Sequence, residues 1–481
     1  MNDRYNNVDL AQVQRIHVMG VCGSGMGTFA GMLRTRGFEV RGSDAGCYPP
    51  MSDLLADWGI PVMEGYHPDN LAWQPDLVVV GNVIRRTNIE AEAMRELNIP
   101  HISFPEALSQ WFLNEKHSIV ISGTHGKTTT TSLTAWLLHS GGTDPSYLVG
   151  GVPLNFGKSY RLGTGPHFVV EGDEYDTAYF DKVPKFLHYQ PQTAVITNIE
   201  FDHADIYPTV EAIESEFRKM VRLIPPTGRL IVCGDNRRAM DVATAAQCTV
   251  QTYGTEDSFW SARDIQQNTN GTQFVLYRDG QAIGPFQAPL FGRHNIQNTV
   301  AALAIGLDEG MDPSQALKGL QSFQNVKKRH EIKGIARGVT VIDDFAHHPT
   351  AVRETVRAVS TRYPDSRLWC CFEVESNTSR RRVFQQAYID AFSGAHCVVF
   401  CKPLAKKDNL AASERLDLES LVQDIQNQGT EAQLIPEVQD IVSWLTDRLR
   451  PGDVVLGMSG RHFYGLHDLL LKRLNETQTS V

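Results

Sequence analysis

The segment that most constrains this chain is 119–130, which reads Ile-Val-Ile-Ser-Gly-Thr-His-Gly-Lys-Thr-Thr-Thr. An apolar, β-branched run enters a glycine turn, and a Lys, a Thr and an apolar-periodic segment come after it. This order predicts a strand, a phosphate-binding loop and a helix. Successive backbone N–H groups in such a turn point at an anion, and the N-terminus of the following helix adds partial positive charge.

Two side chains of this loop suit a nucleotide. Lys127 can reach the β- and γ-phosphates, and the Thr128 hydroxyl can ligate Mg²⁺. The loop has the short form G-x-x-G-K-T, because the longer G-x-x-x-x-G-K-[ST] form would need a glycine where this chain has Ile121. This predicts nucleotide binding and points away from ordinary GTPases and kinases. The alternative is a glycine turn that only joins a strand to a helix.

The length and composition predict a multidomain globular protein. The chain has 481 residues, and at roughly 150 residues per domain this indicates three domains. Hydrophobic residues make up 42% and charged residues 21%, as in ordinary globular proteins. A formal net charge of −10 argues against nucleic acid as a main partner, since phosphate neutralisation needs a basic face. The first residues are polar and no run of about 18 apolar residues occurs, so neither an export signal nor a membrane span is expected.

The cysteines favour a reducing compartment. They form no C-x-x-C pair and show no zinc-ligand spacing. Most lie in apolar, strand-like contexts, where a free thiol packs as a small hydrophobe. A cytoplasmic location is therefore expected. The cysteines are Cys22, Cys47, Cys233, Cys248, Cys370, Cys371, Cys397 and Cys401.

Short β-branched runs alternate with helical patterns along the chain, which predicts parallel α/β sheets. A more polar stretch, 258–287, carries Asn-Gly at 270–271 and Asp-Gly at 279–280, so it is expected to form antiparallel strands joined by tight turns. Domain hinges are expected near residues 114 and 326. The strand candidates are 16–19, 38–41, 77–80, 118–122, 168–171, 194–197, 229–233, 339–342, 368–372, 397–400 and 453–456.

A second glycine-rich loop, 20–26, reads Gly-Val-Cys-Gly-Ser-Gly-Met, follows a strand candidate and opens a helix. Such a loop can hold a pyrophosphate at the helix N-terminus. Asp44, at the end of the next strand, can accept a hydrogen bond from a ribose hydroxyl. NAD is the obvious ligand, but any diphosphate nucleotide, such as a UDP-sugar, suits the same geometry. A simple structural turn is the alternative.

Acidic side chains follow two strand candidates of the central block. Residues 171–176 read Glu-Gly-Asp-Glu-Tyr-Asp, and carboxylates at a strand end beside a phosphate loop are expected Mg²⁺ ligands, Glu174 foremost. Further along, His203 lies between Asp202 and Asp205, which suits a second cation or a polarised carboxylate. A solvated acidic turn and a structural histidine are the alternatives.

The third block contributes a polar cluster at a strand end. Residues 342–350 read Ile-Asp-Asp-Phe-Ala-His-His-Pro-Thr. Asp344 could bond a ribose, Phe345 could stack on a base, and an imidazole could contact phosphate or an anionic substrate.

Two further residues suit ATP. Arg329, in the basic segment 327–330, could reach the γ-phosphate when domains close, although a solvated basic linker is the alternative. Asn295 opens a helix after the predicted hairpins. It could contact the adenine edge or act as an N-cap, and the cap is favoured when the residue is taken alone.

Together these motifs resemble one family, the Mur ligases of bacterial cell-wall synthesis. They occur in the family's order and cover nearly the whole chain. The 20–26 loop with Asp44 is similar to the N-terminal UDP-sugar domain of the branch that acts on UDP-N-acetylmuramate, so a UDP-sugar replaces NAD as the expected ligand. The other matching segments are 123–129, 171–174, 197–203, 292–295 and 343–349.

The resemblance implies an α/β fold with three domains. A Rossmann-like UDP-N-acetylmuramate-binding domain would take residues 1–113, a phosphate-loop ATPase-type domain 114–326, and a Rossmann-like acceptor domain 327–481. The protein is expected to act in the bacterial cytoplasm, as a monomer or weak homodimer, with neither nucleic acid nor membrane as a partner. Its place would be peptidoglycan synthesis and recycling, and so cell-wall biogenesis, cell shape, the cell cycle and cell division.

The implied reaction is ATP-dependent amide ligation. ATP phosphorylates the lactyl carboxylate of the muramate to an acyl phosphate, and the incoming amine displaces phosphate through a tetrahedral intermediate. Such chemistry needs charge neutralisation and in-line positioning more than a covalent nucleophile. The segments 43–52, 174–182, 185–189 and 200–205 resemble the branch that recycles the tripeptide L-Ala-γ-D-Glu-meso-diaminopimelate. Tyr175 agrees with that branch, because the L-alanine-adding relative has Ser there.

The resemblance also implies roles around the phosphates. Lys127 would contact the β- and γ-phosphates and Arg329 the γ-phosphate. Thr128 and Glu174 would hold one Mg²⁺, and His203 a second.

The remaining implied roles concern the substrates. His125 would contact the muramate side and His348 the reacting centre, Asp344 the ribose, and Asn295 and Phe345 the adenine. Loop residues Gly123, Thr124, Gly126 and Thr129 would complete the ATP site. The expected UDP-sugar residues are Gly20, Cys22, Gly23, Ser24, Gly25, Met26, Ser43, Asp44 and Asn82.

Three segments depart from the family pattern. Where several Mur ligases carry a carbamylated lysine, this chain has Phe217 and Arg218, and no carbamate is assigned. Glu375 replaces an Arg expected to face the peptide carboxylates, with the three arginines 380–382 as candidates to compensate. The late motif Ser-Asn-Gly-Gly-Phe-Gly-Gly reads Ser-Gly-Arg-His-Phe-Tyr-Gly at 459–465. The last two departures leave the acceptor open between the tripeptide and L-alanine.

Two other classes remain as alternatives. A folylpolyglutamate-type synthase would share the central and C-terminal domains, but it lacks a UDP-sugar domain, so segment 20–44 counts against it. A nucleotide-binding regulator without chemistry predicts loss of Lys127, Glu174 or His203, and all three are present.

Overall fold

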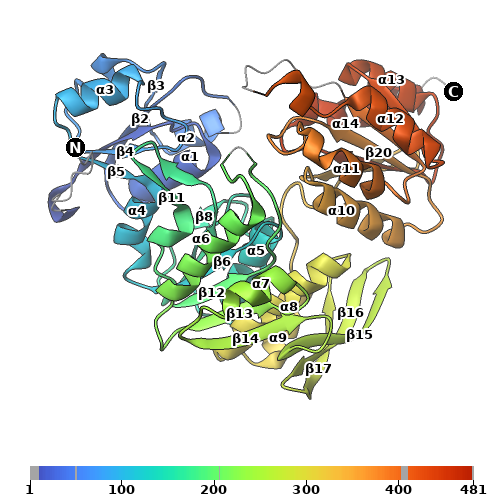
Figure 1. Cartoon of the computed structure of the whole chain (residues 1–481), viewed down its shortest axis with the longest axis horizontal. Helices are drawn as coiled ribbons and strands as arrows, with labels where there is room; N and C mark the ends of the chain where they lie inside the picture. Colours follow the sequence, from blue (N-terminus) through green and yellow to red (C-terminus); the bar gives the residue numbers. More distant parts are fainter. Residues whose placement is uncertain (1–9, 49–50, 205, 402–409, 479–481) are drawn as a thin grey trace. The chain divides into compact units, whose positions relative to one another are not determined.

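The structure is a computed structural model, and it describes residues 10–48, 51–204, 206–401 and 410–478 (Figure 1). Asp205 and the residues 49–50 of the motif 43–52 lie outside the described residues. The chain forms two compact units. The first comprises Met1–Ile199, Glu211–Tyr253 and Ala301–Ala316, and the second comprises Glu200–Val210, Gly254–Val300 and Leu317–Val481. Among the described residues, none of the helices combines the length and the apolar character that crossing a membrane requires.

The first unit begins with a parallel sheet in the order β3-β2-β1-β4-β5. Because strand order reverses at β1, the crevice above β1 and β4 is where ligands bind in doubly wound sheets. The loops after β1, β2 and β4 therefore lie at this edge. The elements are β1 Arg15–Met19, α1 Ser24–Thr35, β2 Glu39–Asp44, α2 Met51–Asp57, β3 Val62–Glu64, β4 Leu77–Val80, α3 Ile89–Glu96, β5 His101–Ser103 and α4 Phe104–Leu108.

The second sheet of this unit runs β14-β13-β12-β6-β9-β7-β8 and is parallel except at β7–β8. The middle residues of its central strands β12, β6 and β9 are apolar and buried, as expected for strands covered on both faces. The elements are β6 His117–Ser122, α5 Lys127–Ser140, β7 Ser146–Leu148, β8 Tyr160–Arg161, β9 His167–Gly172, β12 Thr193–Ile196, α6 Val210–Leu223, β13 Arg229–Cys233, α7 Arg237–Ala243 and β14 Thr249–Gly254.

A short antiparallel hairpin, β10 Asp176–Ala178 and β11 Asp181–Pro184, follows the acidic segment after β9. Its tip packs against the N-terminal sheet. Tyr179 and Phe180 contact the cluster of Met19, Val80 and Met94 side chains. The Arg95 guanidinium donates a hydrogen bond of 2.8 Å to the Tyr179 hydroxyl. The sequence did not predict this hairpin.

The second unit contains the predicted antiparallel strands and a six-stranded sheet. The hairpin strands are β15 Trp260–Asn268, β16 Gly271–Arg278 and β17 Gln281–Ala288. Asp279 and Gly280 both have positive φ, 48° and 75°, as the tight hairpin turn requires. This confirms the prediction for 258–287. Helices α8 Arg293–Asp308 and α9 Pro313–Gln321 follow.

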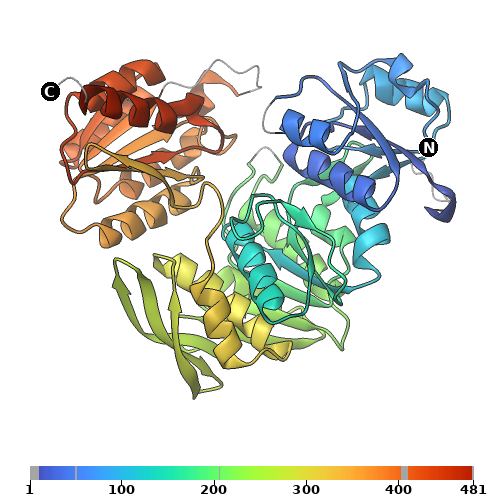
Figure 2. The same cartoon turned by 180° about the vertical axis from the view of Figure 1, so that it is seen from behind.

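The six-stranded sheet runs β18-β19-β23-β20-β21-β22, with only β18 antiparallel to its neighbour. Alternate residues of β20 enter opposite cores: Cys370 and Phe372 pack with α10, α11 and α12, and Trp369 and Cys371 with α13 and α14. Figure 2 shows helices on both faces of this sheet. The elements are β18 Glu331–Ala336, β19 Val339–Asp344, α10 Pro349–Arg362, β20 Leu368–Glu373, α11 Gln385–Ala391, β21 Cys397–Cys401, α12 Leu418–Asn427, β22 Glu431–Ile435, α13 Val438–Thr446, β23 Val454–Met458 and α14 Leu466–Gln478.

Candidate active site

The predicted phosphate loop joins β6 to α5. Gly123 and Gly126 have φ of +130° and +87°, and a Cβ at Gly123 would lie 2.1 Å from the Thr197 hydroxyl oxygen, so glycine is required there. The Thr124 amide donates to the Asn198 carbonyl and the His125 amide to Asn198 Oδ1, both at 2.9 Å. The end of β12 therefore fixes the loop. The amides at the start of α5 remain directed at the loop opening, where helix N-terminal N–H groups have no intrahelical partner.

Lys127 is the cation at the centre of this loop. Its Nζ donates to the Gly123 carbonyl at 2.7 Å and to both Glu174 oxygens at 2.9 and 3.2 Å, and it lies 4.0 Å from Asp173 Oδ1. Burial lowers the pKa of the Lys127 amine, but the negative charges of Glu174 and Asp173 raise this pKa by a larger combined amount. The net pKa of Lys127 therefore lies above its usual value. Lys127 is therefore held as an ammonium.

Glu171 is a second carboxylate at this loop. It accepts hydrogen bonds from the Thr128 hydroxyl at 3.1 Å and from the Gly150 amide at 2.6 Å. Burial, and then the nearby Asp173, raise the pKa of Glu171 to about 6. Sequence reasoning did not assign Glu171 a role of its own.

The donor set around Thr128 fits Mg²⁺. A hydroxyl and the carboxylates of Glu171 and Glu174 are hard oxygen ligands, and Mg²⁺ takes one or two such carboxylates together with substrate phosphates. A divalent cation held here would neutralise the charge that develops on phosphate oxygens.

Lys185, which follows the β10–β11 hairpin, reaches back to this acidic turn. Its Nζ lies 3.1 Å from Asp173 Oδ2 and 5.7 Å from the centre of the Tyr175 ring. Asp173 thus lies between two lysines, Lys127 and Lys185. The sequence contained both lysines, but nothing in their spacing indicated this contact.

The N-terminal loop has the predicted arrangement. Gly20, with φ of +83°, ends β1, and α1 begins at Ser24 with Gly23 as its N-cap. The Cys22 amide donates to Asp44 Oδ2 at 2.8 Å, and the Gly20 amide to the Ser43 carbonyl at 2.8 Å. The Ser43 hydroxyl turns inward to Glu90. Gly25 is exposed, Met26 is buried, and Asn82 is exposed in the turn after β4.

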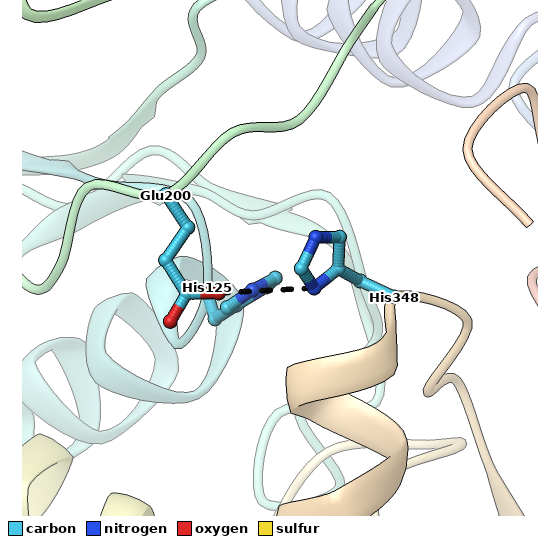
Figure 3. A group of neighbouring side chains, drawn as sticks. All are labelled: His125, Glu200 and His348. Atoms are coloured by element: carbon cyan, nitrogen blue, oxygen red, sulfur yellow. Dashed lines mark ion pairs between the residues drawn. The ribbon is translucent and has the colours of Figure 1, made fainter. Parts of the chain in front are cut away.

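The second unit holds the other predicted residues. His348 caps α10: its Nδ1 accepts from the Thr350 amide at 3.3 Å, and its Nε2 lies 3.2 Å from the Phe201 carbonyl. Glu200 Oε2 lies 3.8 Å from Nδ1 and accepts from the Thr350 hydroxyl at 2.6 Å. Figure 3 draws Glu200 and His348, with the ion pair dashed, and also draws His125.

His203 has a left-handed backbone, with φ of +52°. The neighbouring Asp202 accepts from the His203 amide at 2.7 Å and from the Thr378 hydroxyl at 2.5 Å. The His203 ring nitrogen Nε2 lies 3.7 Å from Asp202 Oδ2. An imidazole beside a carboxylate is suited to a metal ligand or a polarised base.

The residues predicted for adenosine lie in the same unit. Asp344 accepts from the His330 amide and the Ala346 amide, both at 2.8 Å. The Arg329 guanidinium lies 4.9 Å from the centre of the Phe345 ring, so cation–π contact holds the two together.

Asn295 is not the N-cap of its helix, so that interpretation was wrong. Helix α8 begins at Arg293, and the Asn295 amide already donates to the Gly292 carbonyl. The buried Asn295 side chain instead donates to the Phe291 carbonyl at 2.9 Å. The cap preference failed because the helix begins two residues before the most cap-like residue.

The glycine loop on a parallel sheet, with a buried lysine and hard oxygen donors beside it, defines a nucleotide-binding enzyme of the α/β class that uses phosphates and a divalent cation. Comparisons with known proteins agree with this class. Three family models match the chain: the Mur ligase family catalytic domain at residues 15–116, the Mur ligase middle domain at 121–306, and the Mur ligase glutamate ligase domain at 328–461.

Similar proteins span nearly the whole chain. A relative from Escherichia coli, named UDP-N-acetylmuramate–L-alanyl-γ-D-glutamyl-meso-2,6-diaminoheptandioate ligase, is 37% identical, covering 96% of this chain and 98% of its own length. A UDP-N-acetylmuramate–L-alanine ligase from Acetivibrio thermocellus is 30% identical, covering 97% of each. The crystal structure of a murein peptide ligase from Psychrobacter arcticus has a TM-score of 0.72 at 34% identity, covering 96% of this chain and 99% of that one.

This chain belongs to the Mur ligase family. It has the three-domain α/β fold of that family, and it is an ATP-dependent ligase that forms an amide bond. Mur ligases use ATP with Mg²⁺. The domain limits at 113 and 326 and the roles of single residues stay predictions.

Proposed function

We propose that this enzyme joins the tripeptide L-Ala-γ-D-Glu-meso-diaminopimelate to UDP-N-acetylmuramate in cytoplasmic recycling of cell-wall peptides. The relatives support this acceptor, since the tripeptide ligase of Escherichia coli is 37% identical and the L-alanine ligase of Acetivibrio thermocellus is 30% identical. The enzyme would work as a monomer or weak homodimer with two Mg²⁺ ions.

The observation that carries the proposal is the segment after Glu174. Tyr175 is exposed there, and Lys185 returns from the hairpin to bond Asp173 beside the phosphate loop. An aromatic ring and an ammonium at the mouth of the acidic turn offer a contact surface for a peptide larger than one amino acid. A site for L-alanine alone would need a closed pocket for a small amine.

The chemistry follows from charge. A carboxylate and the γ-phosphate repel one another, so the acyl phosphate forms only where cations neutralise both. Lys127 would hold the β- and γ-phosphates and Arg329 the γ-phosphate. One Mg²⁺ held by Thr128 and Glu174, and a second Mg²⁺ held by His203, would supply further positive charge. The tripeptide amine would then attack the acyl carbon and phosphate would leave.

The two departures from the family pattern in the C-terminal domain are in contact. Arg461 Nη1 lies 3.1 Å from Glu375 Oε1, and the Arg461 side chain is 66% exposed whereas that of Glu375 is 10% exposed. The Arg461 amide donates to the Ser459 hydroxyl at 2.8 Å, and Lys328 bonds the Arg461 carbonyl. Glu375 stands where the family pattern has an arginine, so the positive charge of that arginine is missing here. We infer that Arg461, on a neighbouring loop, supplies this charge and faces the carboxylates of the peptide.

L-Alanine is the alternative acceptor, because Glu375 itself cannot bind a peptide carboxylate. The deciding experiment is ATP-dependent phosphate release with UDP-N-acetylmuramate and Mg²⁺, comparing L-alanine with the tripeptide. Release with the tripeptide and little with L-alanine is expected. A preference for L-alanine would make this a ligase of de novo synthesis, and no release with either would refute both acceptors.

A further inference from the structure

The N-terminal loop contains a disulfide bond that the sequence did not predict. Cys22, in the loop after β1, is bonded to Cys47, in the segment after β2, with their Cα atoms 5.3 Å apart. The other six cysteines are not disulfide-bonded. The bond therefore lies at the one place where a thiol pair connects two segments of the proposed UDP-sugar site.

Hydrogen bonds accompany the disulfide. The Cys22 amide donates to Asp44 Oδ2 at 2.8 Å, and the Gly20 and Val21 amides donate to the Ser43 carbonyl at 2.8 and 3.2 Å. In this state the loop amide at Cys22 is turned to a carboxylate of the protein. The same amide would be needed for a phosphate or ribose oxygen of a bound nucleotide.

We propose that Cys22 and Cys47 form a reversible redox modification site, and that the oxidised pair closes the loop to UDP-sugars. The inference rests on the proposed function, because it takes UDP-N-acetylmuramate as the ligand. A ligand atom between two backbone segments needs van der Waals contact of about 3.5 Å on each side, more than a 5.3 Å Cα separation allows. The reduced loop can separate from Cys47 and admit the nucleotide.

The modification needs an oxidant, and a small disulfide such as glutathione disulfide supplies it. The Cys22 thiolate attacks one sulfur of that disulfide and releases one small thiol. The Cys47 thiolate then attacks Cys22 Sγ, forms the protein disulfide and releases the second small thiol. Two electrons pass from the protein to the oxidant, and both protein protons end on the released thiols. In a reducing cytoplasm a disulfide of this kind is transient and regulatory.

The remaining cysteines explain why oxidation would select this pair. Cys370 and Cys371 are fully buried, and burial raises the pKa of both thiols. Cys22 and Cys47 are partly exposed and lie within bonding distance of each other. Reactivity follows thiolate character and access, so the strand cysteines are poor competitors.

The test is calorimetric binding of UDP-N-acetylmuramate to the full chain after treatment with dithiothreitol or glutathione disulfide. The oxidised protein should bind about 10-fold or more weakly, because only the residual reduced fraction is competent. Mass spectrometry of unreduced peptides should show the Cys22–Cys47 link. The double variant Cys22→Ser/Cys47→Ser, which can form neither the protein disulfide nor a mixed disulfide at these two positions, should bind equally in both conditions. Cys248→Ser, a half-buried free cysteine elsewhere in the same unit, should keep the redox response.

Equal binding by the reduced and oxidised wild type would overturn the inference and leave the proposed function intact. A redox response that persists in Cys22→Ser/Cys47→Ser, or the absence of the Cys22–Cys47 link after oxidation, would also overturn it. Reduced wild type that binds no UDP-N-acetylmuramate would instead contradict the proposed function, and the inference with it.

Discussion

At the scale of single residues, the site depends on one lysine held among carboxylates. Lys127 is buried, charged and bonded to Glu174, and this contact crosses from the phosphate loop to the end of the neighbouring strand β9. A buried ammonium without a partner would be costly, so the acidic turn keeps Lys127 in place before a nucleotide arrives. When phosphate and a cation bind, Lys127 can exchange Glu174 for a phosphate oxygen, so its positive charge still has a negative partner.

Replacing Lys127 with Ala should lower kcat by about 100-fold or more, since a positioned group that stabilises transition-state charge is commonly worth that much. The measurement is steady-state phosphate release at saturating ATP. Lys182→Ala is the matched control, because Lys182 lies on the nearby hairpin, is 63% exposed and pairs only peripherally with Asp176. Wild-type kcat in Lys127→Ala would remove this residue from the mechanism.

The exposed Arg461 should determine affinity for the peptide. Arg461→Ala is expected to raise KM for the tripeptide about 10-fold, as loss of a charge-assisted hydrogen bond predicts, with kcat for bound substrate changed little. Arg473→Ala, on α14 and 56% exposed, is the control. The double variant Glu375→Ala/Arg461→Ala completes a mutant cycle. An unchanged tripeptide KM in Arg461→Ala would assign the peptide carboxylates to another residue.

At the scale of elements, apolar strands were predictable and short strands of mixed polarity were not. Strands β4 and β13 have the predicted bounds, since β4 is entirely apolar and β13 is apolar after Arg229. The hairpin β10–β11 has strands of three and four residues with mixed polarity, and no period-2 pattern can emerge from so few positions.

The same limit applies to the site. The glycine loop and the acidic turn could be recognised because each is a local motif. The contact of Asn198 with the His125 amide spans 73 residues, and that of Arg461 with Glu375 joins two loops, so neither has a local signature. The Cys22–Cys47 bond was missed because spacing alone cannot show which cysteines meet in space.

The hairpin β10–β11 should contribute to stability through its contact with α3. Tyr179→Phe removes the hydrogen bond from Arg95 and is expected to lower the free energy of unfolding by about 1 kcal/mol. Urea denaturation monitored by circular dichroism measures this. Tyr277→Phe, on β16, should stay within about 0.5 kcal/mol of wild type. Equal losses in the two variants would show that the Tyr179 contact is not specific.

The end of β19 should make stability depend on pH through Asp343. Burial raises the pKa of Asp343 from 3.8 to about 6, with Lys328 opposing and Asp344 adding to the rise. The folded state therefore binds more protons than the unfolded state between these values, and this carboxyl makes wild-type stability fall as pH rises through the window. His467 faces Asp343 at 3.7 Å, and burial lowers the pKa of His467 to about 4.

Asp343→Asn should therefore stabilise the protein by an amount that grows from near zero at pH 4 to about 3 kcal/mol at pH 7. His467 is present in both proteins, so the comparison largely removes its contribution. Urea denaturation across this range measures the difference. The exposed Asp365→Asn should show no such slope. A constant difference between wild type and Asp343→Asn would mean that Asp343 keeps its ordinary pKa when folded.

At the scale of the whole molecule, the residues predicted to contact ATP are divided between the two compact units. The phosphate loop belongs to the first unit, whereas Asn295, Arg329, Asp344 and Phe345 belong to the second. The sequence predicts that Arg329 reaches the γ-phosphate when domains close, and steps of this kind commonly limit kcat. Arg329 follows the predicted hinge at 326 and is held against Phe345 by a cation–π contact.

Arg329→Ala should therefore lower kcat by about 100-fold or more while the affinity for UDP-N-acetylmuramate, whose proposed site is in the first unit, changes less than about 2-fold. Phosphate release gives kcat and calorimetry gives the affinity on the same preparations. Arg357→Ala, on α10 and 66% exposed, should match wild type in both. If kcat and the affinity for the UDP-sugar both fall in Arg329→Ala, the substitution disturbs the folded structure rather than the reaction alone. If it loses neither, the γ-phosphate is neutralised by other groups, and closure is not coupled to turnover through this arginine.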